Sequence, residues 1–526
     1  MNRLATALVG LATLAGAAQA DPARPMLVVG IVVDQLRTDY IEGLQSRFSE
    51  HGFRYLIKDG VYFRDVDFKV SPLDAASATA MLYTGSYPAQ TGVPSASVFE
   101  QTSSGPVSRP ALASAGTVSN DSFTPENLRL STVADEVAID GVGLGAVYSI
   151  ATEPQQAVIM AGHAAKNAVW LNNTTGNWAT SSYYGSLPVP VSNRNFRASL
   201  SSRLDTMQWR PLLPLDGVQG ISDIKLKHPF RHQFVRADRD VYRKFSSSAL
   251  ANAEVTDLAI EFIRQLKMGG GPALDMLSLG YTAAPFKYVA DTDFRAELAD
   301  SYIRLDRQLG RLFEAIDRYV GADNALIFIS STGYYDDAVV EEKKYRIPGG
   351  EFSTKRAKSL LNSYLSAKHG SAGYVEAIRD RHVFLDHKAI EARKLDPEAI
   401  ARDARTFLAK MSGVAEVYTV SDILSPATPE QESMRLALDP RFAGDLIVNY
   451  APGWDVVDDE EFPPVKRSMR SSPVASPAFL IGAGLAPAVI STPVDATVIA
   501  PTVTGLLRIR SPNGSEGRPM QLDRKE

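Results

Sequence analysis

The sequence predicts an α/β fold, in which a central, mainly parallel β-sheet lies between layers of helices and carries a cap insertion. The length of 526 residues fits one large α/β core with insertions. Residues 26–33 form a continuous apolar run rich in β-branched side chains, which is typical of a strand buried on both faces. Helix and strand patterns then alternate along the chain, and this order favours a parallel sheet that is covered on both sides.

The spacing of the apolar residues predicts the other elements. Apolar residues three and four apart indicate helices, and short apolar runs indicate strands. The expected helices cover residues 77–83, 132–139, 302–316, 398–411 and 500–507. The expected strands cover residues 144–150, 276–279, 325–329, 414–419, 445–450 and 478–481. Two polar stretches, 172–190 and 455–466, are expected to be loops.

The first twenty residues have the pattern of an export signal. Arg3 precedes a mostly apolar stretch, and Ala18-Gln19-Ala20 supplies the small residues that a signal peptidase recognises. A strand or helix of the fold is the alternative, but Asp21-Pro22 breaks the segment before the next apolar run begins. We therefore expect a signal peptide at 1–20 and a mature domain at 21–526, in the periplasm or at the outer envelope. Cap insertions are expected at about 151–240 and 335–440.

The composition excludes several classes of partner and site. The net charge is -5 with a pI of about 5.9, and no stripe of Lys and Arg with interleaved aromatic residues is present, so nucleic acid is not expected as a partner. After the leader, no stretch approaches the roughly 18 apolar residues of a membrane span, and no transmembrane segment is expected. The chain has no Cys, which excludes disulfides, thiolate metal ligands and a lipid-attachment cysteine.

Two acidic features are candidate sites. Asp34 follows the first predicted strand, at the sheet edge where ligands gather, but the same position suits the N-cap of a following helix. A run of acids near residue 460 has the ligand type that Ca²⁺ prefers, although such a run beside prolines is more often a solvated surface. The run comprises Asp455, Asp458, Asp459, Glu460 and Glu461.

Several short motifs occur in the order that is known from one enzyme superfamily. They are Val29-Gly30-Ile31-Val32-Val33-Asp34, Tyr83-Thr84-Gly85, Gly162-His163, Gly176-Asn177-Trp178, Tyr302-Ile303-Arg304-Leu305-Asp306 and Ala500-Pro501-Thr502. With them the chain resembles the alkaline phosphatase superfamily, in particular the bacterial periplasmic phosphatases with a Thr nucleophile and the nucleotide pyrophosphatase-phosphodiesterases. The resemblance implies a mainly parallel sheet between helices and two zinc ions held by three Asp and three His. It also implies phosphoryl transfer to a Ser or Thr.

The resemblance locates the positions at which catalysis would occur. Asp34 matches the first Asp ligand of the family. The nucleophile position falls on Ala75, whose methyl group can neither attack phosphorus nor bind a metal. The Asn that assists the substrate falls on Ala96, and the Lys and Arg that clamp the phosphoryl group fall on Glu153 and Gln155. A carboxylate at the clamp repels a phosphate dianion.

The other metal ligands implied by the resemblance are replaced. The second Asp and a His fall on Pro285 and Val289, and the family's Asp-His-Gly after the strand at 325–329 is Ser331-Thr332-Gly333 here. Asp336 and Asp337 lie three and four residues past Gly333, too far along to be simple replacements.

The positions of the histidines test the ligand set without an alignment. No His occurs between His232 and His369, and none follows His387, although the family's three His ligands belong to these intervals. His163, His382 and His387 are expected to be structural, since an isolated ring can satisfy both nitrogens by local hydrogen bonds.

The sequence therefore favours a catalytically degenerate phosphatase-like protein of the bacterial envelope. We expect it to be a binding or scaffold subunit, and we expect no cofactor. The alternative is a metal-dependent phosphatase or phosphodiesterase with a rebuilt site, in which zinc would bind Asp34 with Asp336 or Asp337. An envelope protein is the expected partner. The aromatic segment at 170–184 is one candidate for its contact, although these aromatics more often pack a cap onto a core.

Overall fold

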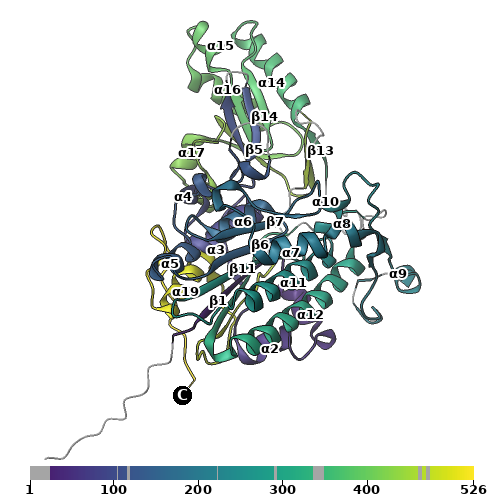
Figure 1. Cartoon of the computed structure of the whole chain (residues 1–526). Helices are drawn as coiled ribbons and strands as arrows, with labels where there is room; N and C mark the ends of the chain where they lie inside the picture. The colour runs from purple at the N-terminus through teal and green to yellow at the C-terminus, as the bar shows by residue number, and fades with distance from the viewer. Residues whose placement is uncertain are drawn as a thin grey trace, which may run out of the picture.

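The computed structural model describes residues 24–102, 105–114, 119–218, 220–221, 223–288, 293–335, 349–459, 465–468 and 474–525, with the backbone alone at 223–224 and 465–468. Figure 1 shows a broad base, built on the central sheet, and a narrow cap at the top. Within the described ranges, no helix is both long and apolar enough to cross a membrane.

A mostly parallel sheet forms the centre of the base. In the described part of the chain it has nine strands in the order β21-β2-β20-β12-β1-β11-β6-β7-β8. Their bounds are β1 Leu27–Asp34, β2 Val61–Phe63, β6 Val147–Ala151, β7 Asn167–Leu171, β8 Trp178–Ala179, β11 Asp275–Thr282, β12 Ala325–Ser331, β20 Ala478–Gly482 and β21 Ala488–Ile490. β1 pairs in parallel with β11 on one side and β12 on the other, and β20 is antiparallel to β12. The predicted α/β class with a mainly parallel sheet is confirmed.

Helices cover both faces of this sheet (Figure 1). Val29, Ile31 and Val33 of β1 face a core shared with α2, α11 and α12, whereas Val28 and Val32 face a second core shared with α3, α5, α6 and α19. The alternation follows from the period of two in a strand, so an entirely apolar β1 fills both cores. The helices of the base are α1 Thr38–Gly43, α2 Phe53–Asp59, α3 Ala75–Thr84, α4 Pro88–Thr91, α5 Val133–Asp140, α6 Pro154–Ala161, α7 Val189–Arg197, α8 Leu200–Arg203, α9 Asp223–Lys227, α10 Val241–Ser246, α11 Ala249–Gln265, α12 Arg295–Tyr319 and α19 Ile499–Leu507.

The cap contains residues 349–459 and has a hydrophobic core of its own. Its helices are α14 Thr354–His369, α15 His387–Ala392, α16 Pro397–Leu408, α17 Val420–Leu424 and α18 Pro429–Ala437. Its strands are β13 Gly350–Ser353, β14 Val375–Arg379, β15 His382–Leu385, β16 Val414–Thr419, β17 Leu446–Tyr450 and β18 Trp454–Asp458, and β19 Val465–Ser468 pairs with β18.

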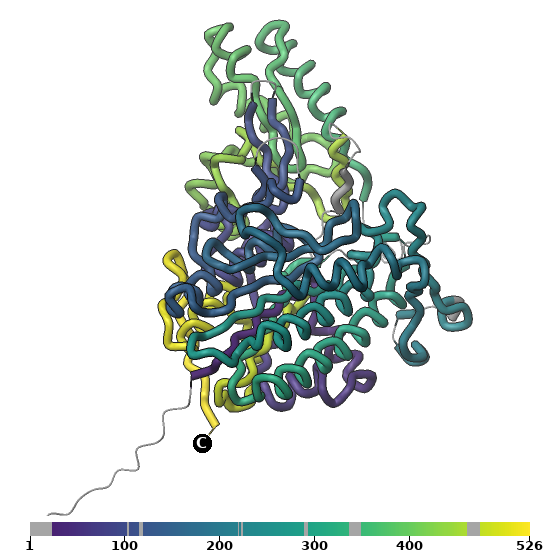
Figure 2. Tube along the Cα trace, viewed as in Figure 1, coloured from purple at the N-terminus to yellow at the C-terminus, as the bar shows by residue number. Residues whose placement is uncertain are grey.

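A hairpin from the base joins the cap. It consists of β4 (Ser97–Thr102) and β5 (Gly105–Pro110), and it rises beside the cap strands in the tube view of Figure 2. Phe99 of β4 packs in one buried cluster with Ala377 and Phe384 of the cap. Two further pairs of short strands, β3 Val66–Asp67 with β22 Val494–Asp495 and β9 Gln208–Trp209 with β10 His232–Gln233, lie in the base.

The two stretches predicted as insertions differ in character. Residues 335–440 overlap most of the cap. Residues 151–240, in contrast, supply β7 and β8 of the central sheet as well as α6 to α9, so this stretch is in part core. The predicted loop at 172–190 contains β8 and the start of α7, because Trp178 is apolar enough to continue the sheet edge.

Candidate functional site

The carboxyl ends of the central strands form the candidate site. Asp34 ends β1, and its Oδ1 accepts a hydrogen bond of 3.0 Å from Thr332 Oγ1, just beyond β12. The same hydroxyl accepts a bond of 2.9 Å from the backbone amide of Gln35. Asp34 is not a helix N-cap, since Arg37 holds that position before α1. Its side chain is therefore placed at the ligand edge of the sheet, beside Thr332, the residue at the position that the resemblance assigns to a His ligand.

The start of α3 holds Ala75, the position that the resemblance assigns to the nucleophile. Asp74 is the N-cap and forms a capping box with Ser77. The Ser77 hydroxyl donates to Asp74 Oδ1 at 3.0 Å, and the Thr79 hydroxyl donates to the carbonyl of Ala75 at 2.6 Å. Both hydroxyls are buried. The first turn of α3 thus offers a methyl group at the nucleophile position, and its two nearby hydroxyls are engaged within the helix.

A chain of hydrogen bonds connects α3 to the other positions named from the sequence. Asp74 Oδ2 accepts from the amide of Ala96 at 2.6 Å, and Gln155 Nε2 donates to the carbonyl of Ala96 at 2.8 Å. Gln155 lies in the first turn of α6, two residues after Glu153, the N-cap of that helix. The structure therefore brings the Ala75, Ala96 and Gln155 positions into one neighbourhood.

Glu153 has the most perturbed carboxyl of the site. Although Glu153 is accessible to solvent, desolvation by the surrounding protein raises the pKa of its carboxyl to about 7. The negative charge of Asp34 raises the pKa further, whereas the positive charge of Arg243 and a hydrogen bond with Asn173 lower it. Asp34 and Glu153 consequently belong to the same electrostatic environment, which α10 borders with Arg243.

The remaining ligand positions carry no metal-binding side chain where the structure describes them. Pro285 is buried, and Ser331 and Thr332 are buried at the end of β12. Val289, Asp336 and Asp337 lie outside the described residues, as do Glu460 and Glu461 of the acidic run. Among the residues that the structure does describe, no group of three or more His, Cys, Asp or Glu is arranged to hold a metal ion.

The histidines named above have partners in their own surroundings. His163 pairs with Asp135 at 3.1 Å, and this hydrogen bond raises the pKa of the imidazole. His387 pairs with Asp445 at 2.7 Å, and His382 Nδ1 accepts from the backbone amide of Gly444 at 3.3 Å. These three rings stabilise α5, α15 and the β15–β17 edge, which agrees with the structural role expected for them.

The acidic run and the aromatic segment have different roles from those weighed in the sequence. Asp459 accepts bonds from Ser353 and from the amide of Lys355, so it holds the first turn of α14, and Asp458 is buried. These two acids form neither a solvated surface nor a Ca²⁺ loop. Trp178 and Tyr184 are buried, at 3% and 8% exposure, which makes them core residues and not a partner surface.

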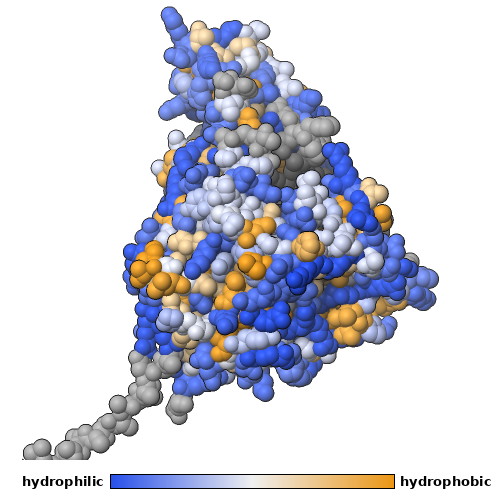
Figure 3. Space-filling view, in the orientation of Figure 1, coloured by the Kyte–Doolittle hydropathy of each residue, from blue (hydrophilic) through white to orange (hydrophobic). Residues whose placement is uncertain are grey.

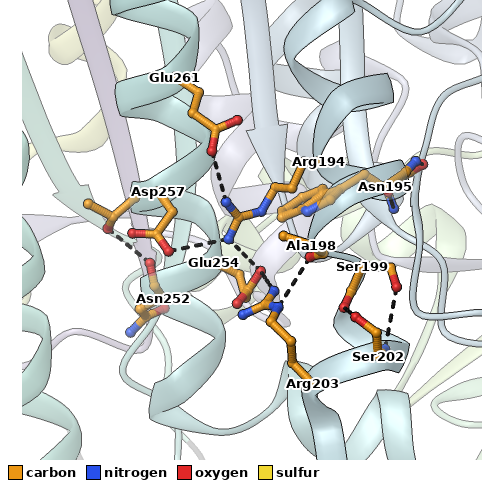
Figure 4. A network of polar contacts seen from close by, with 12 residues as sticks. Arg194, Asn195, Ala198, Ser199, Ser202, Arg203, Asn252, Glu254, Asp257 and Glu261 are labelled. Carbon is orange, nitrogen blue, oxygen red and sulfur yellow. Dashed lines mark hydrogen bonds and ion pairs between the residues drawn. The ribbon is translucent and has the colours of Figure 1, made fainter.

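A buried ion-pair network joins α7 to α11 (Figure 4). Arg194 of α7 pairs with Glu254 at 2.7 Å and with Glu261 at 3.1 Å, both on α11, and Arg203 adds a second pair to Glu254 at 2.9 Å. Asn252, two residues before Glu254, exchanges two hydrogen bonds with the backbone of Thr282 at the end of β11. The network thereby anchors the helix that holds one strand end at the site.

The family of the chain follows from a comparison over most of its length. The family model of type I phosphodiesterase / nucleotide pyrophosphatase matches residues 28–472. The chain belongs to this family. It is 28% identical over 524 residues to a protein named calcium-transporting ATPase from Myroides odoratus, covering 95% of this chain and 94% of the relative. It is 26% identical over 516 residues to alkaline phosphatase PafA of Elizabethkingia meningoseptica, covering 94% of each chain.

Solved structures of this phosphodiesterase family share the fold. The crystal structure of wild-type PafA matches with a TM-score of 0.80 at 25% identity, covering 95% of this chain and 98% of PafA. A PafA variant in which a Thr, an Asn, a Lys and an Arg are replaced matches with a TM-score of 0.81 at the same identity and the same coverage of both chains. Membership of the alkaline phosphatase superfamily and the alkaline phosphatase fold, both expected from the sequence motifs, are confirmed.

Several residues of the site were not identified from the sequence. Asp74 carries only part of a readable signal, because Asp favours the N-cap position, but the usual capping box has Glu or Gln, and not Ser, three residues later. Thr332 was named as a lost ligand but not as the hydrogen-bond partner of Asp34. Arg243 lies far from the motifs in sequence, and Asn173 lies three residues before Gly176, but no local pattern indicates that either approaches Glu153.

Proposed function

We propose that this chain is a catalytically degenerate member of its family, an exported envelope protein that retains the phosphatase fold for binding or as a scaffold. The observation that carries the proposal is the first turn of α3. Ala75 stands at the nucleophile position, and the hydroxyls of Ser77 and Thr79 are buried and bonded within the helix. Phosphoryl transfer in this fold requires a hydroxyl that can approach phosphorus, and this turn offers none.

Spacing relative to PafA supports the same conclusion. In the PafA variant the replaced Thr and Asn are 21 residues apart, and the replaced Lys and Arg are two apart. Ala75 and Ala96 have the first spacing in this chain, and Glu153 and Gln155 have the second. The structure joins these positions through Asp74 and the hydrogen bonds of Ala96. On this correspondence, four positions that are polar in the phosphatase would hold two methyl groups, an acid and an amide here.

The charges of the site also oppose phosphate binding. Asp34 and Glu153 act on one another electrostatically, and Asp74 adds a carboxylate at the start of α3, where backbone amides would otherwise attract an anion. Arg243 opposes them with a single guanidinium. Stabilising a phosphoryl transition state needs positive groups directed at its oxygens, and this arrangement is predominantly negative.

A second candidate function is hydrolysis at a rebuilt site. The names of the relatives favour it, since PafA and a further relative from Synechococcus elongatus, 26% identical over 515 residues, are both called alkaline phosphatases. In this alternative, zinc would bind Asp34 together with Asp336 or Asp337. An activated water would then replace the missing Thr.

Metal content and turnover distinguish these two functions. The mature chain is purified, analysed for zinc, and assayed with a phosphate monoester and a phosphate diester in the presence of added Zn²⁺. We expect no stoichiometric zinc and no turnover above buffer for the wild type or for Asp34→Ala. Asp323→Ala, an exposed carboxylate at the opposite end of β12, is the matched control. Zinc-dependent turnover that is lost in Asp34→Ala and kept in Asp323→Ala would overturn the proposal.

Export and partner binding belong to the same proposal and have separate tests. N-terminal sequencing of the protein from an envelope fraction should begin at Asp21, and an intact Met1 would contradict export. Figure 3 shows that the visible face is largely hydrophilic with apolar residues in scattered groups, which suits a contact of limited area. Cross-linking in intact envelopes should recover a specific neighbour if the chain binds one, and recovery of the chain alone favours a scaffold without a ligand.

A further inference from the structure

The turn that follows α5 exposes three aliphatic side chains to solvent. Ile139, Val142 and Leu144 are 52%, 84% and 75% exposed. Single exposed apolar residues are ordinary on a protein surface, but these three lie within six residues of one another along the chain. We call residues 139–145 the aliphatic turn, and it forms a local apolar group on the surface of the base.

The fold holds the aliphatic turn in place. The backbone amides of residues 141–144 each donate a hydrogen bond to a carbonyl of the turn or of the end of α5. Val142 has a φ of +49°, a region that β-branched residues rarely adopt. Gly145 packs on the backbone of Leu274, since a Cβ atom at Gly145 would lie 2.3 Å from the Leu274 carbonyl oxygen. The turn is therefore fixed against the base, with the side chains of Val142 and Leu144 left in solvent.

The aliphatic turn lies where the chain enters the fold. Asp140 of the turn forms an ion pair with Arg24, the residue at which the described chain begins. Figure 1 shows α5 and the start of β1 on the same side of the base. The expected leader has its apolar stretch at 4–18, a short distance before Arg24 in the sequence. A leader held in a bilayer during export would place the aliphatic turn beside the membrane surface.

The charges at this edge of the sheet balance one another. The edge consists of the segments that lead into five strands, namely residues 24–26, 139–146, 162–166, 266–275 and 321–324. It carries three basic side chains, Arg24, Lys166 and Lys267, and three acidic ones, Asp140, Asp275 and Asp323. Its one histidine, His163, is hydrogen-bonded to Asp135 of α5. Because no net charge of either sign stands out, the aliphatic side chains are the feature that decides what binds here.

A lipid surface suits the aliphatic turn better than a protein partner does. The hot spots of protein interfaces are enriched in Trp, Tyr and Arg, whereas Leu and Val are under-represented among them. The turn contains no aromatic residue and no Arg. Ile, Leu and Val are among the side chains that enter a bilayer most favourably. The composition of the turn and its position beside the start of the chain therefore both favour a membrane.

We propose that the aliphatic turn is a peripheral membrane contact, in which Ile139, Val142 and Leu144 enter the interface of a lipid bilayer. The turn leads into the amino end of β6, whereas the candidate site lies at the carboxyl ends of the central strands. The candidate site consequently faces away from the bilayer. The contact does not depend on the loss of catalysis, and it would stand if that proposal failed.

Co-sedimentation with lipid vesicles tests the contact. The mature chain, residues 21–526, is mixed with vesicles of phosphatidylcholine alone or with vesicles that also contain about 30% phosphatidylglycerol. We expect binding to both, and no tighter binding to the anionic vesicles, because the charges of this edge balance. Val142→Asn combined with Leu144→Ser should weaken binding at least about tenfold, since burying even one such side chain contributes about that much. Asn tolerates the positive φ at residue 142, so this variant should keep the fold.

Phe196→Ser is the matched control. Phe196 is 89% exposed on α7, which packs on the opposite face of the sheet from α5, and its loss should leave binding unchanged. Because the chain has no Cys, Leu144→Cys and Phe196→Cys can each carry a single environment-sensitive fluorophore. Only the fluorophore at residue 144 should shift its emission to shorter wavelength when vesicles are added.

Four results would overturn the proposal. The first is no binding up to about 1 mM lipid. The second is binding to the anionic vesicles alone, and the third is an equal loss of binding in Phe196→Ser and in the double variant. The fourth is self-association in sedimentation velocity that the double variant abolishes, which would make the aliphatic turn a contact between copies of the chain.

Discussion

Replacing Arg194 by Met tests whether the buried network of Figure 4 stabilises the base through charge pairing. The guanidinium is 6% exposed and pairs with Glu254, which is 4% exposed, and with Asp257 and Glu261, which are partly exposed. Met fills a similar volume but leaves the Glu254 carboxylate with one partner, Arg203 at 2.9 Å. Breaking a buried pair on one side costs about 3–5 kcal/mol. Because Arg203 remains, we expect a loss near 3 kcal/mol.

Urea unfolding followed by tryptophan fluorescence measures this loss. Trp178 is a local reporter, since its backbone exchanges hydrogen bonds with Asn195, the neighbour of Arg194 on α7. The matched control is Arg197→Met, an exposed residue of the same helix, which should change the free energy of unfolding by less than about 0.5 kcal/mol.

A second substitution isolates the cause. If the Glu254 carboxylate, which then keeps only Arg203, is responsible for the loss, Arg194→Met combined with Glu254→Gln should be more stable than Arg194→Met alone, because the incompletely compensated buried charge is gone. Equal losses for Arg194→Met and Arg197→Met would refute the charge-pairing argument. A double variant no more stable than Arg194→Met would show that lost packing, and not charge, determines the effect.

Three further predictions concern single side chains. The pKa of Glu153 rises from its ordinary value of 4.5 to about 7 in the fold, so the folded protein disfavours the charged form of this carboxyl. Glu153→Gln should therefore stabilise the protein at pH 8 but not at pH 4, by less than about 1 kcal/mol because solvent screens an accessible group. Thermal melting at both pH values checks the sign. Trp178→Ala should lower the free energy of unfolding, measured in urea, by about 3–5 kcal/mol. A melting temperature close to that of the wild type would contradict the place of Trp178 in the core. Asp306→Asn should lower the free energy of unfolding by about 1–3 kcal/mol, because the buried carboxylate accepts hydrogen bonds from the backbone amides of Ser49 and Phe53 and a side-chain amide has only one oxygen to accept them. Calorimetry would show no change if these bonds contribute nothing.

Local sequence patterns predicted the strands whose two faces are both apolar and the helices with a strongly periodic apolar face. The run at 26–33 became β1, the spacing around residue 305 became α12, and the strand predicted at 414–419 has the bounds of β16. The predicted loop at 455–466 failed because Asp455 and Asp458 lie in β18, where pairing with β13 and β19 outweighs the low strand propensity of Asp. Tertiary pairing of this kind leaves no local signal.

The site was predictable to the extent that it depended on residue identity. The sequence alone shows that Ala75 stands at the position that the resemblance assigns to the nucleophile, and that two intervals lack His. The pairing of Thr332 with Asp34 and the approach of Arg243 to Glu153 are not, because they join segments separated by 298 and 90 residues. For Trp178 the sequence left partner contact open beside the favoured core packing, since an aromatic side chain gives the same pattern in a core and at an interface, and its burial shows that it packs in the core.

The position of β20 determines when the chain can complete its fold. This strand lies between β12 and β2, yet it comes almost last in the sequence, at Ala478–Gly482. Until it is present, β12 and β2 expose unpaired backbone edges, and such edges associate with other chains. A nascent chain therefore cannot close its central sheet until nearly all of it has emerged, and a truncation before residue 478 should aggregate instead of forming a smaller stable base.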